Sequence, residues 1–303
     1  MPRTRSRLHR SGVAVAVCAI AIAGIVSAAG ASSSRPHATP TPKYDPAAAK
    51  LVPASIKAKS KAGGLIEAFD ATYPPDEFLA ADNKTIIGFD APLGRALAIT
   101  LGLKFVPKNI TFANIIPRLL SGAVQIGNSS FTDNKLREKQ VNFTDYFVAG
   151  EAFYVLSSSS LVLNSLAALC GHSVAVELGT VEATDAQNES SKCPSGKSIT
   201  VVTYPTQTDA NAAVAAGHQE AGFADSQVSG YIVKQSKGVF KVAGTAINVA
   251  PYGIATSKKT TFDKALLAAM NDLIKNGVYM HILKQWGVQA GAVKKAAINN
   301  PTL

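Results

Sequence analysis

Histidines, cysteines and catalytic motifs are scarce in this chain of 303 residues. The five histidines are scattered, and none lies at helical spacing from a cysteine or carboxylate partner, so the sequence predicts no zinc site. No Ser/His/Asp or Cys/His arrangement is legible, and the sequence contains no internal repeat. We therefore expect no metal, no other cofactor and no catalytic residues.

Acidic residues are scarce only towards the N-terminus. The whole chain has a formal net charge of +10, but four basic residues fall in 1–31 and six more in 32–61, against the single acid Asp45. Residues 62–303 then hold 20 basic and 19 acidic residues, which is a net charge of +1. A nucleic-acid-binding domain needs a basic face on its folded part. Composition provides none, and we expect no nucleic-acid partner.

Long apolar runs are also missing. The uncharged apolar stretch from Val13 to Val26 is shorter than the roughly 18 residues expected of a spanning helix. It follows four arginines and precedes small residues, an order typical of a secretory signal peptide, which we place at 1–31. A membrane anchor is the alternative. A lipoprotein anchor at Cys18 is disfavoured because Val17 precedes it. We expect an extracytoplasmic protein that stays associated with the cell envelope.

Residues 32–61 are rich in Ser, Pro, Ala and Lys and show no apolar periodicity. Such composition predicts a disordered tether. Cys18 leaves with the predicted signal peptide, so Cys170 and Cys193 remain as an even pair in an exported protein. That favours one disulfide, with two free thiols as the alternative.

Short strand-like and helix-like segments alternate from Leu65 onwards. Leu65–Phe69 reads as a strand, and apolar residues recur at helical spacing from Ala91 to Leu101. A second set of alternations begins near Ala149. This order predicts an α/β fold with a largely parallel sheet. Ligands of such sheets bind beyond the strand C-termini, where Asp70 and Ser130 fall.

Two hydroxyls and one guanidinium follow a strand-like segment at fixed offsets. Ser130, Thr132 and Arg137 can together receive a carboxylate, because the arginine fork binds it bidentately and the hydroxyls reach its outer lone pairs. Three other stretches follow one another along the chain in the order that a known family has: Thr72–Pro75, Gly88–Asp90 and Ile115–Phe147. With the clamp, they resemble the family 3 extracellular solute-binding proteins, which deliver amino acids to ABC importers.

The resemblance covers about 62–290 and implies a fold and partners. It implies two α/β lobes of the type II periplasmic-binding-protein kind, joined by crossings near 149–153 and 248–253. Lobe 1 would comprise 62–150 plus 251–303, and lobe 2 would comprise 151–250. The ligand would be an amino acid or close derivative, delivered by lobe closure to transmembrane ABC permease subunits. The protein itself would be a monomer.

The resemblance also assigns the ends of the ligand. Arg137 matches the arginine that binds the α-carboxylate, with Ser130 and Thr132 as hydrogen-bonding neighbours. Taken alone, Arg137 could form a surface salt bridge with a neighbouring acid. Asp225, after an apolar strand, matches the acid that pairs with the α-ammonium, or else it caps a helix.

The side-chain pocket is implied in the same way. Tyr73 and Phe112 match aromatics between which the ligand side chain stacks, although either could be a core residue. Asp70 matches an acid that reaches the ligand side chain in some members, or it caps the turn. Thr180 and Val181 match a loop whose backbone amides meet the carboxylate at a helix start. Val181 stands where a second threonine is usual, so one hydroxyl contact is lost.

Two further acids bear on function. Asp76 stands where an apolar residue is common, and a negative charge near the pocket mouth would favour a cationic ligand. Glu182 is the nearest general acid for a rival function, a cyclohexadienyl or arogenate dehydratase on the same fold. A solvent-facing helix residue is the expected environment for Glu182. A ligand-sensing module is the third possibility, and the sequence does not name the amino acid.

Overall fold

The computed structural model describes residues 39–302. The predicted signal peptide (1–31), with Cys18, and the first part of the predicted tether (32–38) lie outside these residues. Within 39–302, no helix combines the length and apolarity needed to cross a bilayer.

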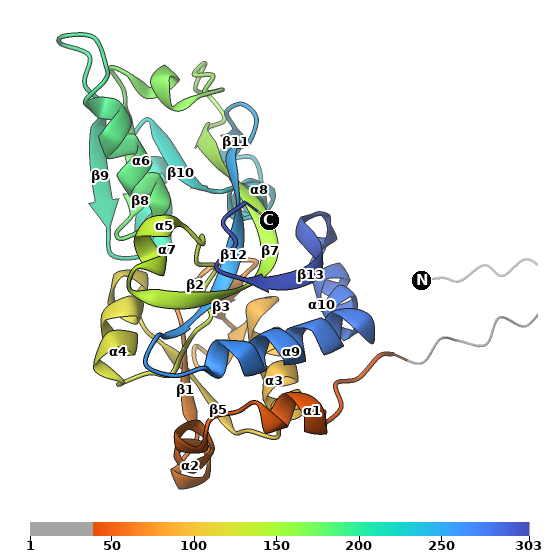
Figure 1. The fold of residues 1–303 in the computed structure, drawn as a ribbon. Helices are drawn as coiled ribbons and strands as arrows, with labels where there is room; N and C mark the ends of the chain where they lie inside the picture. Colours follow the sequence, from red (N-terminus) through yellow and green to blue (C-terminus); the bar gives the residue numbers. More distant parts are fainter. Residues whose placement is uncertain (1–38, 303) are drawn as a thin grey trace, which may run out of the picture. The chain divides into compact units, whose positions relative to one another are not determined.

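One ten-stranded sheet organises the described chain (Figure 1). Its strand order is β5-β1-β6-β12-β7-β10-β8-β9, and β11 and β13 both pair with β7. One half of the sheet contains the parallel strands β1 (Leu65–Phe69), β5 (Phe105–Asn109) and β6 (Ile126–Gly127). The other half contains β8 (Ser173–Glu177), β9 (Thr200–Tyr204) and β10 (Ala221–Asp225), also parallel. The other strands are β11 (Phe240–Val242), β13 (Ala292–Ile298) and the small antiparallel sheet of β2 (Thr72–Tyr73), β3 (Glu77–Leu79) and β4 (Ile86–Ile87).

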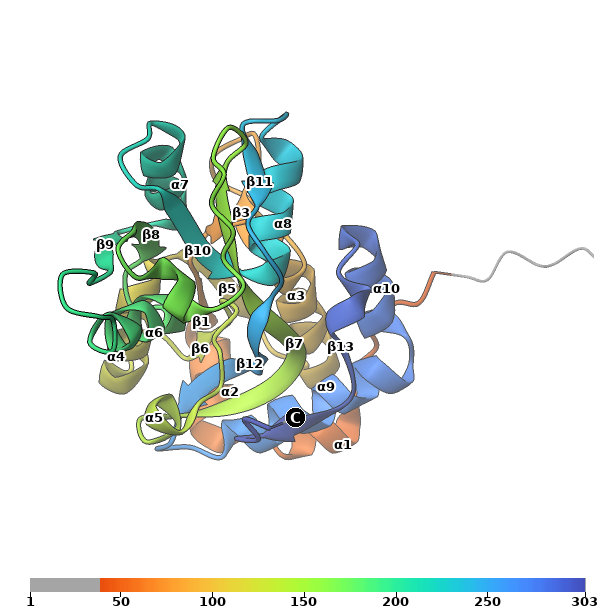
Figure 2. The ribbon, with the colours of Figure 1, turned by 90° about the horizontal axis from the view of Figure 1, so that it is seen from above.

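Two long strands join the halves. β7 (Val141–Leu156) and β12 (Ile247–Ser257) pair antiparallel and run side by side in Figure 2. β12 also pairs with β6, and β7 also pairs with β10. We call the half that contains β1 lobe 1 and the half that contains β8 lobe 2. The predicted α/β architecture with two crossover segments is confirmed, whereas the predicted lobe boundaries stay a prediction.

Glycines end the helices that flank the lobe 1 strands. α3 (Asp90–Leu101) and α4 (Ile115–Ser121) end at Gly102 and Gly122, whose φ values of 62° and 77° glycine adopts without steric penalty. Buried residues of α3 and α9 (Phe262–Lys275) belong to one apolar core. The other helices are α5 (Lys135–Glu138), α6 (Val181–Ser190), α7 (Gln207–Ala215), α8 (Ser226–Gln235), α10 (Val278–Trp286) and the 3-10 turns at Phe112–Asn114, Leu166–Leu169 and Gln289–Gly291.

The predicted tether is wrong from Pro46 onwards, because two helices occupy its C-terminal part. These are α1 (Pro46–Lys50) and α2 (Ala54–Ala62). Ala48, Val52 and Ile56 are buried in the same core as α3 and α9. They lie on α1, on the turn after it and on α2, so no single helical period marks them in the sequence. The folded part of the protein therefore begins before residue 62.

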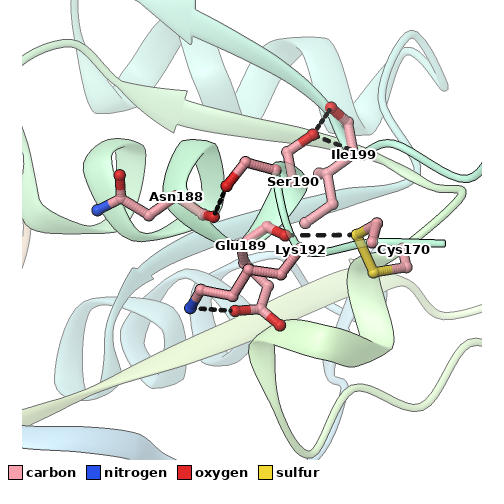
Figure 3. The surroundings of a disulfide bond; sticks show 8 residues. Cys170, Asn188, Glu189, Ser190, Lys192 and Ile199 are labelled. Atoms are coloured by element: carbon pink, nitrogen blue, oxygen red, sulfur yellow. Dashed lines mark hydrogen bonds and ion pairs between the residues drawn. A yellow bond between two sulfur atoms is a disulfide. The ribbon is translucent and has the colours of Figure 1, made fainter. Parts of the chain in front are cut away.

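The predicted disulfide is confirmed in lobe 2 (Figure 3). Cys170 bonds to Cys193, which lies just beyond the end of α6. Ser190, the last residue of α6, exchanges two hydrogen bonds with the backbone of Ile199, at 2.9 and 3.1 Å. The disulfide and these bonds fix the C-terminal end of α6. Its other end faces the site described next.

Candidate ligand-binding site

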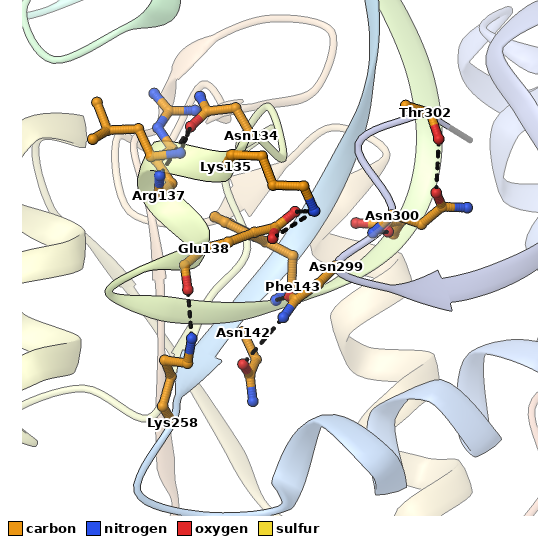
Figure 4. A network of polar contacts seen from close by, with 12 residues as sticks. Asn134, Lys135, Arg137, Glu138, Asn142, Phe143, Lys258, Asn299, Asn300 and Thr302 are labelled. Atoms are coloured by element: carbon orange, nitrogen blue, oxygen red, sulfur yellow. Dashed lines mark hydrogen bonds and ion pairs between the residues drawn. The ribbon is translucent and has the colours of Figure 1, made fainter.

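Arg137 is held in place by a short, well-capped helix. The Asn134 side chain accepts hydrogen bonds from the amides of Leu136 and Arg137, at 3.0 and 2.9 Å, and so starts α5 (Figure 4). At the other end of α5, Lys258 Nζ donates to the Glu138 carbonyl at 2.6 Å. Lys135 forms the ion pair with Glu138, at 2.9 Å. In the described chain, Arg137 therefore forms no surface salt bridge with Glu138.

The guanidinium of Arg137 lies inside the protein, where its side chain bridges the two lobes. Nη1 donates to the Thr132 carbonyl at 2.9 Å, and Nη2 donates to the Gly179 carbonyl of lobe 2 at 3.1 Å. The group also lies over the rings of Phe112 and Phe131, 5.4 and 5.5 Å from their centres. These contacts fix the plane of the guanidinium, as bidentate recognition of a carboxylate requires.

A small pocket lies beside Arg137. All nine side chains predicted from the sequence line it: Asp70, Tyr73, Phe112, Ser130, Thr132, Arg137, Thr180, Val181 and Asp225. Four more lining residues were not predicted as ligand contacts: Glu77, Ser129, Glu177 and Glu182. Residues of both lobes thus converge on one site, although the ligand contact of each residue stays a prediction.

Asp225 faces the pocket rather than capping its helix. It stands at the N-cap of α8, but its side chain makes no capping hydrogen bond. Instead, Tyr73 of lobe 1 donates its hydroxyl proton to Asp225 Oδ2 at 2.8 Å, and the Asp225 amide donates to the same hydroxyl at 3.0 Å. Burial raises the pKa of Asp225 to about 6. A carboxylate in this position can receive an ammonium group.

The N-terminus of α6 supplies backbone donors. The Thr180 hydroxyl accepts from the Ala183 amide at 3.2 Å and donates to the Glu177 carbonyl at 2.8 Å. It is therefore a helix cap as well as a pocket residue. The first amides of a helix have no carbonyl partner within it, and the helix dipole favours an anion there. Loss of a threonine hydroxyl at Val181 leaves this property of the backbone unchanged.

Asp70 caps the turn, which is one of the two roles considered from the sequence, and its contact with a ligand side chain stays a prediction. Its Oδ1 accepts from the Thr72 hydroxyl at 2.7 Å, and its Oδ2 accepts from the Phe112 amide at 2.6 Å, so it does fasten the turn. Its carboxyl also contacts that of Glu177 across the lobes. Burial, followed by this neighbouring acid, raises the pKa of Glu177 well above its usual range.

Ser130 and Asp76 differ from expectation. The Ser130 hydroxyl lines the pocket but donates to Asp76 Oδ2 at 2.8 Å, and Ser130 has a φ of 48°, which is unusual for a residue other than glycine. Asp76 is fully buried behind the pocket. The prediction of a charge near the pocket mouth is therefore wrong, because the turn at 73–76 directs this side chain inwards.

Carboxyl groups greatly outnumber cations in the pocket. Five line it, against the single guanidinium of Arg137: Asp70, Glu77, Glu177, Glu182 and Asp225. Burial raises the pKa of every one of them. Glu182 is only 1% exposed, so its expected solvent-facing position is wrong. Glu177 ends β8 as Asp225 ends β10, and the strand-end rule applied to Asp70 would have found it.

Comparison with known proteins agrees with the family resemblance and the two-lobed fold. Residues 65–289 match the bacterial extracellular solute-binding proteins, family 3. Arginine-binding protein ArgT of Corynebacterium glutamicum is 34% identical over 250 residues, which is 82% of each chain.

Solved structures point the same way. An ancestral arginine-binding protein bound to arginine aligns with a TM-score of 0.69 at 30% identity, covering 74% of this chain and 98% of that one. The ancestral amino acid-binding protein AncCDT-1, described as a precursor of cyclohexadienyl dehydratase, aligns with a TM-score of 0.67 at 27% identity, covering 77% and 98%. The molecule is thus a type II, two-lobed binding protein in architecture. The chain belongs to the bacterial extracellular solute-binding proteins, family 3, as its clamp residues predicted, and this family acts outside the cytoplasm.

Proposed function

We propose that this protein binds a basic amino acid, with L-arginine as the first candidate, and delivers it to an ABC import permease. The observation that carries the proposal is the excess of carboxyl groups over cations in the pocket. A neutral amino acid would use Arg137 for its carboxylate and one acid for its ammonium group. The remaining acids match a ligand with a second positive charge. The arginine-binding relatives support the same choice.

The two ends of the pocket orient such a ligand. Its α-carboxylate pairs with Arg137 and the amides at the start of α6, and its α-ammonium group pairs with Asp225. Its side-chain cation reaches Asp70 and Glu177, whose carboxyl groups already meet across the lobes. A guanidinium has donors in a planar fork and can bond both acids at once, which an ammonium group does less well.

Transport follows from the division of these contacts. Arg137 and Asp70 belong to lobe 1, whereas α6, Glu177 and Asp225 belong to lobe 2. Because each lobe alone offers only part of the contacts, the ligand binds the closed form more tightly and shifts the population towards it. The closed form is the one we expect to dock on the permease. The monomeric state, the lack of a nucleic-acid partner and the association with the cell envelope stay predictions.

Calorimetric titration against single amino acids tests the ligand. Arginine, lysine, ornithine and histidine are compared with glutamine, which has a similar length but no side-chain charge. We expect arginine to bind at least about 100-fold more tightly than glutamine, since a charge-assisted bidentate contact contributes about 3 kcal/mol. Tighter binding of glutamine or glutamate, or no binding by any of the panel, would overturn the proposal.

One observation favours a second candidate function. Glu182 is buried in the pocket, and burial keeps its pKa well above its usual range, so it can act as a proton donor. AncCDT-1 shows that this fold is related to a dehydratase. Incubation with prephenate and arogenate, followed by analysis for aromatic products, tests this candidate, and Glu182→Gln is the control. We infer a binding protein without enzymatic activity, so we expect no product above that of buffer.

A further inference from the structure

A buried chain of hydrogen bonds runs behind the pocket and joins the two lobes. It begins at Ser130, whose hydroxyl donates to Asp76 Oδ2 at 2.8 Å. The same oxygen accepts from Gln227 Nε2 at 2.7 Å. Asp76 belongs to the lobe 1 loop between β2 and β3, and Gln227 belongs to the first turn of α8 in lobe 2. These residues are 151 positions apart in the sequence.

The chain continues to the other end of the pocket. Gln227 Nε2 also donates to the Tyr252 hydroxyl at 2.5 Å, on the crossing strand β12. The Tyr252 side chain in turn lies near the Asp225 carboxyl group. The two ends, Ser130 and Asp225, line the pocket, whereas Asp76, Gln227 and Tyr252 do not. The connection therefore links the carboxylate end to the ammonium end from behind.

The surroundings make this connection rigid. Asp76 is 0% exposed, its amide donates to the Tyr73 carbonyl at 3.0 Å, and its carbonyl accepts from the Asp90 amide at 3.0 Å. The backbone around Asp76 is thus fixed to lobe 1. A hydrogen bond to a carboxyl group shielded from water is stronger than one at the surface. The bond to Gln227 exists only while the lobes are together.

We propose that Asp76 and Gln227 form an interlobe latch, which stabilises the closed form and positions Ser130 and Asp225 for the ligand. They are positioning residues, since neither reaches the pocket. This inference rests on the proposed function, because lobe closure around an amino acid is the event that the latch assists. A residue that favours only the closed form slows ligand release without choosing among ligands.

The test is a double-mutant cycle with Gln227→Leu and Asp76→Leu, in full-length protein. Gln235→Leu is the matched control, because Gln235 is an exposed glutamine at the other end of the same helix. Affinity and release rate are measured for arginine, lysine and glutamine. We expect Gln227→Leu to weaken all three about tenfold or more, through faster release, with the order of the ligands unchanged. We expect the affinity of the double variant to be no lower than that of the single variant that binds more weakly. Either substitution alone already removes the bond between Asp76 and Gln227.

Three results would overturn the latch. The losses of affinity in the two single variants could add up in the double variant, the affinity of Gln227→Leu could stay within threefold of the wild type, or Gln227→Leu could lose no more affinity than Gln235→Leu. Thermal unfolding checks that each variant folds, and Gln227→Met, which keeps the length of the side chain without its donor, replaces Gln227→Leu if that variant does not fold. If no amino acid binds the wild type, the proposed function fails separately. Small-angle scattering then decides the latch, which is overturned if Gln227→Leu leaves the radius of gyration unchanged.

Discussion

Replacing Arg137 with alanine should remove most of the ligand affinity while changing stability little. Arg137 is only 8% exposed, and in the proposed complex it is the only cationic side chain that faces the ligand carboxylate. Leaving a buried carboxylate without its partner costs about 3–5 kcal/mol, which corresponds to a loss of affinity of about 100-fold to several thousand-fold. The five pocket acids, no longer opposed by a cation, would repel the carboxylate further.

The stability of the protein should change much less than its ligand affinity when Arg137 is replaced with alanine. Burial lowers the pKa of Arg137, which means that its charged form is poorly solvated there. Its removal loses two hydrogen bonds to backbone carbonyls and the contacts with Phe112 and Phe131, but it also relieves that desolvation. We expect the Tm to change by less than about 5 °C.

Calorimetry measures the ligand affinity, and thermal unfolding measures the stability, of the wild type, Arg137→Ala and Arg137→Lys. Lysine keeps the charge but not the planar fork, so its affinity should fall between the other two. An Arg137→Ala variant that bound the natural ligand within threefold of the wild type would refute the carboxylate clamp. An unfolded variant would instead assign Arg137 to the core.

Three further predictions concern other parts of the molecule. Glu177→Gln should weaken arginine binding about 10- to 100-fold, because a charge-assisted bond to the ligand side chain is lost, but it should weaken glutamine binding by less than about threefold. Calorimetry with both ligands checks this, and equal losses of affinity would contradict it. Arginine affinity should fall as the pH drops through about 6, because the ammonium group favours ionised Asp225 and acid protonates it. The slope in titrations from about pH 5 to 8 should approach tenfold per unit, and a flat profile would exclude Asp225 as the ammonium partner. Cys170→Ala with Cys193→Ala should lower the free energy of unfolding by about 3 kcal/mol, since the bond closes a loop with a separation of 23 residues, while affinity stays within about twofold. A large change in affinity would show that the disulfide controls the pocket.

The sequence brings the predicted clamp residues to one pocket because they are close together along the chain. Ser130, Thr132 and Arg137 lie within one strand-to-helix connection, so their spacing alone places them on one side of the pocket. Asp225 and Asp70 could be predicted because they follow strands, whose carboxyl ends meet at one edge of each lobe. The α/β alternation is likewise a local signal, repeated many times.

Other features depend on contacts that no local pattern contains. The bond between Asp76 and Gln227 joins positions 151 residues apart, and only the closing of two lobes brings them together. Glu182 is likewise buried near groups that are distant in the sequence, Asp225, Glu151 and Arg137. The helices α1 and α2 were missed for a different reason. Their apolar positions are few, and the surrounding Ser, Pro, Ala and Lys have the composition of a linker.

Under the proposed function, the excess of buried acids makes the pocket a poor site for neutral amino acids. Each carboxyl that loses water without gaining a cation is destabilising, and its raised pKa reports that penalty. A neutral amino acid supplies one ammonium group and leaves Asp70 and Glu177 facing each other. A dication with one carboxylate supplies a partner for that pair as well. Discrimination against neutral amino acids therefore requires no steric exclusion, because the unpaired acids themselves oppose lobe closure around the wrong ligand.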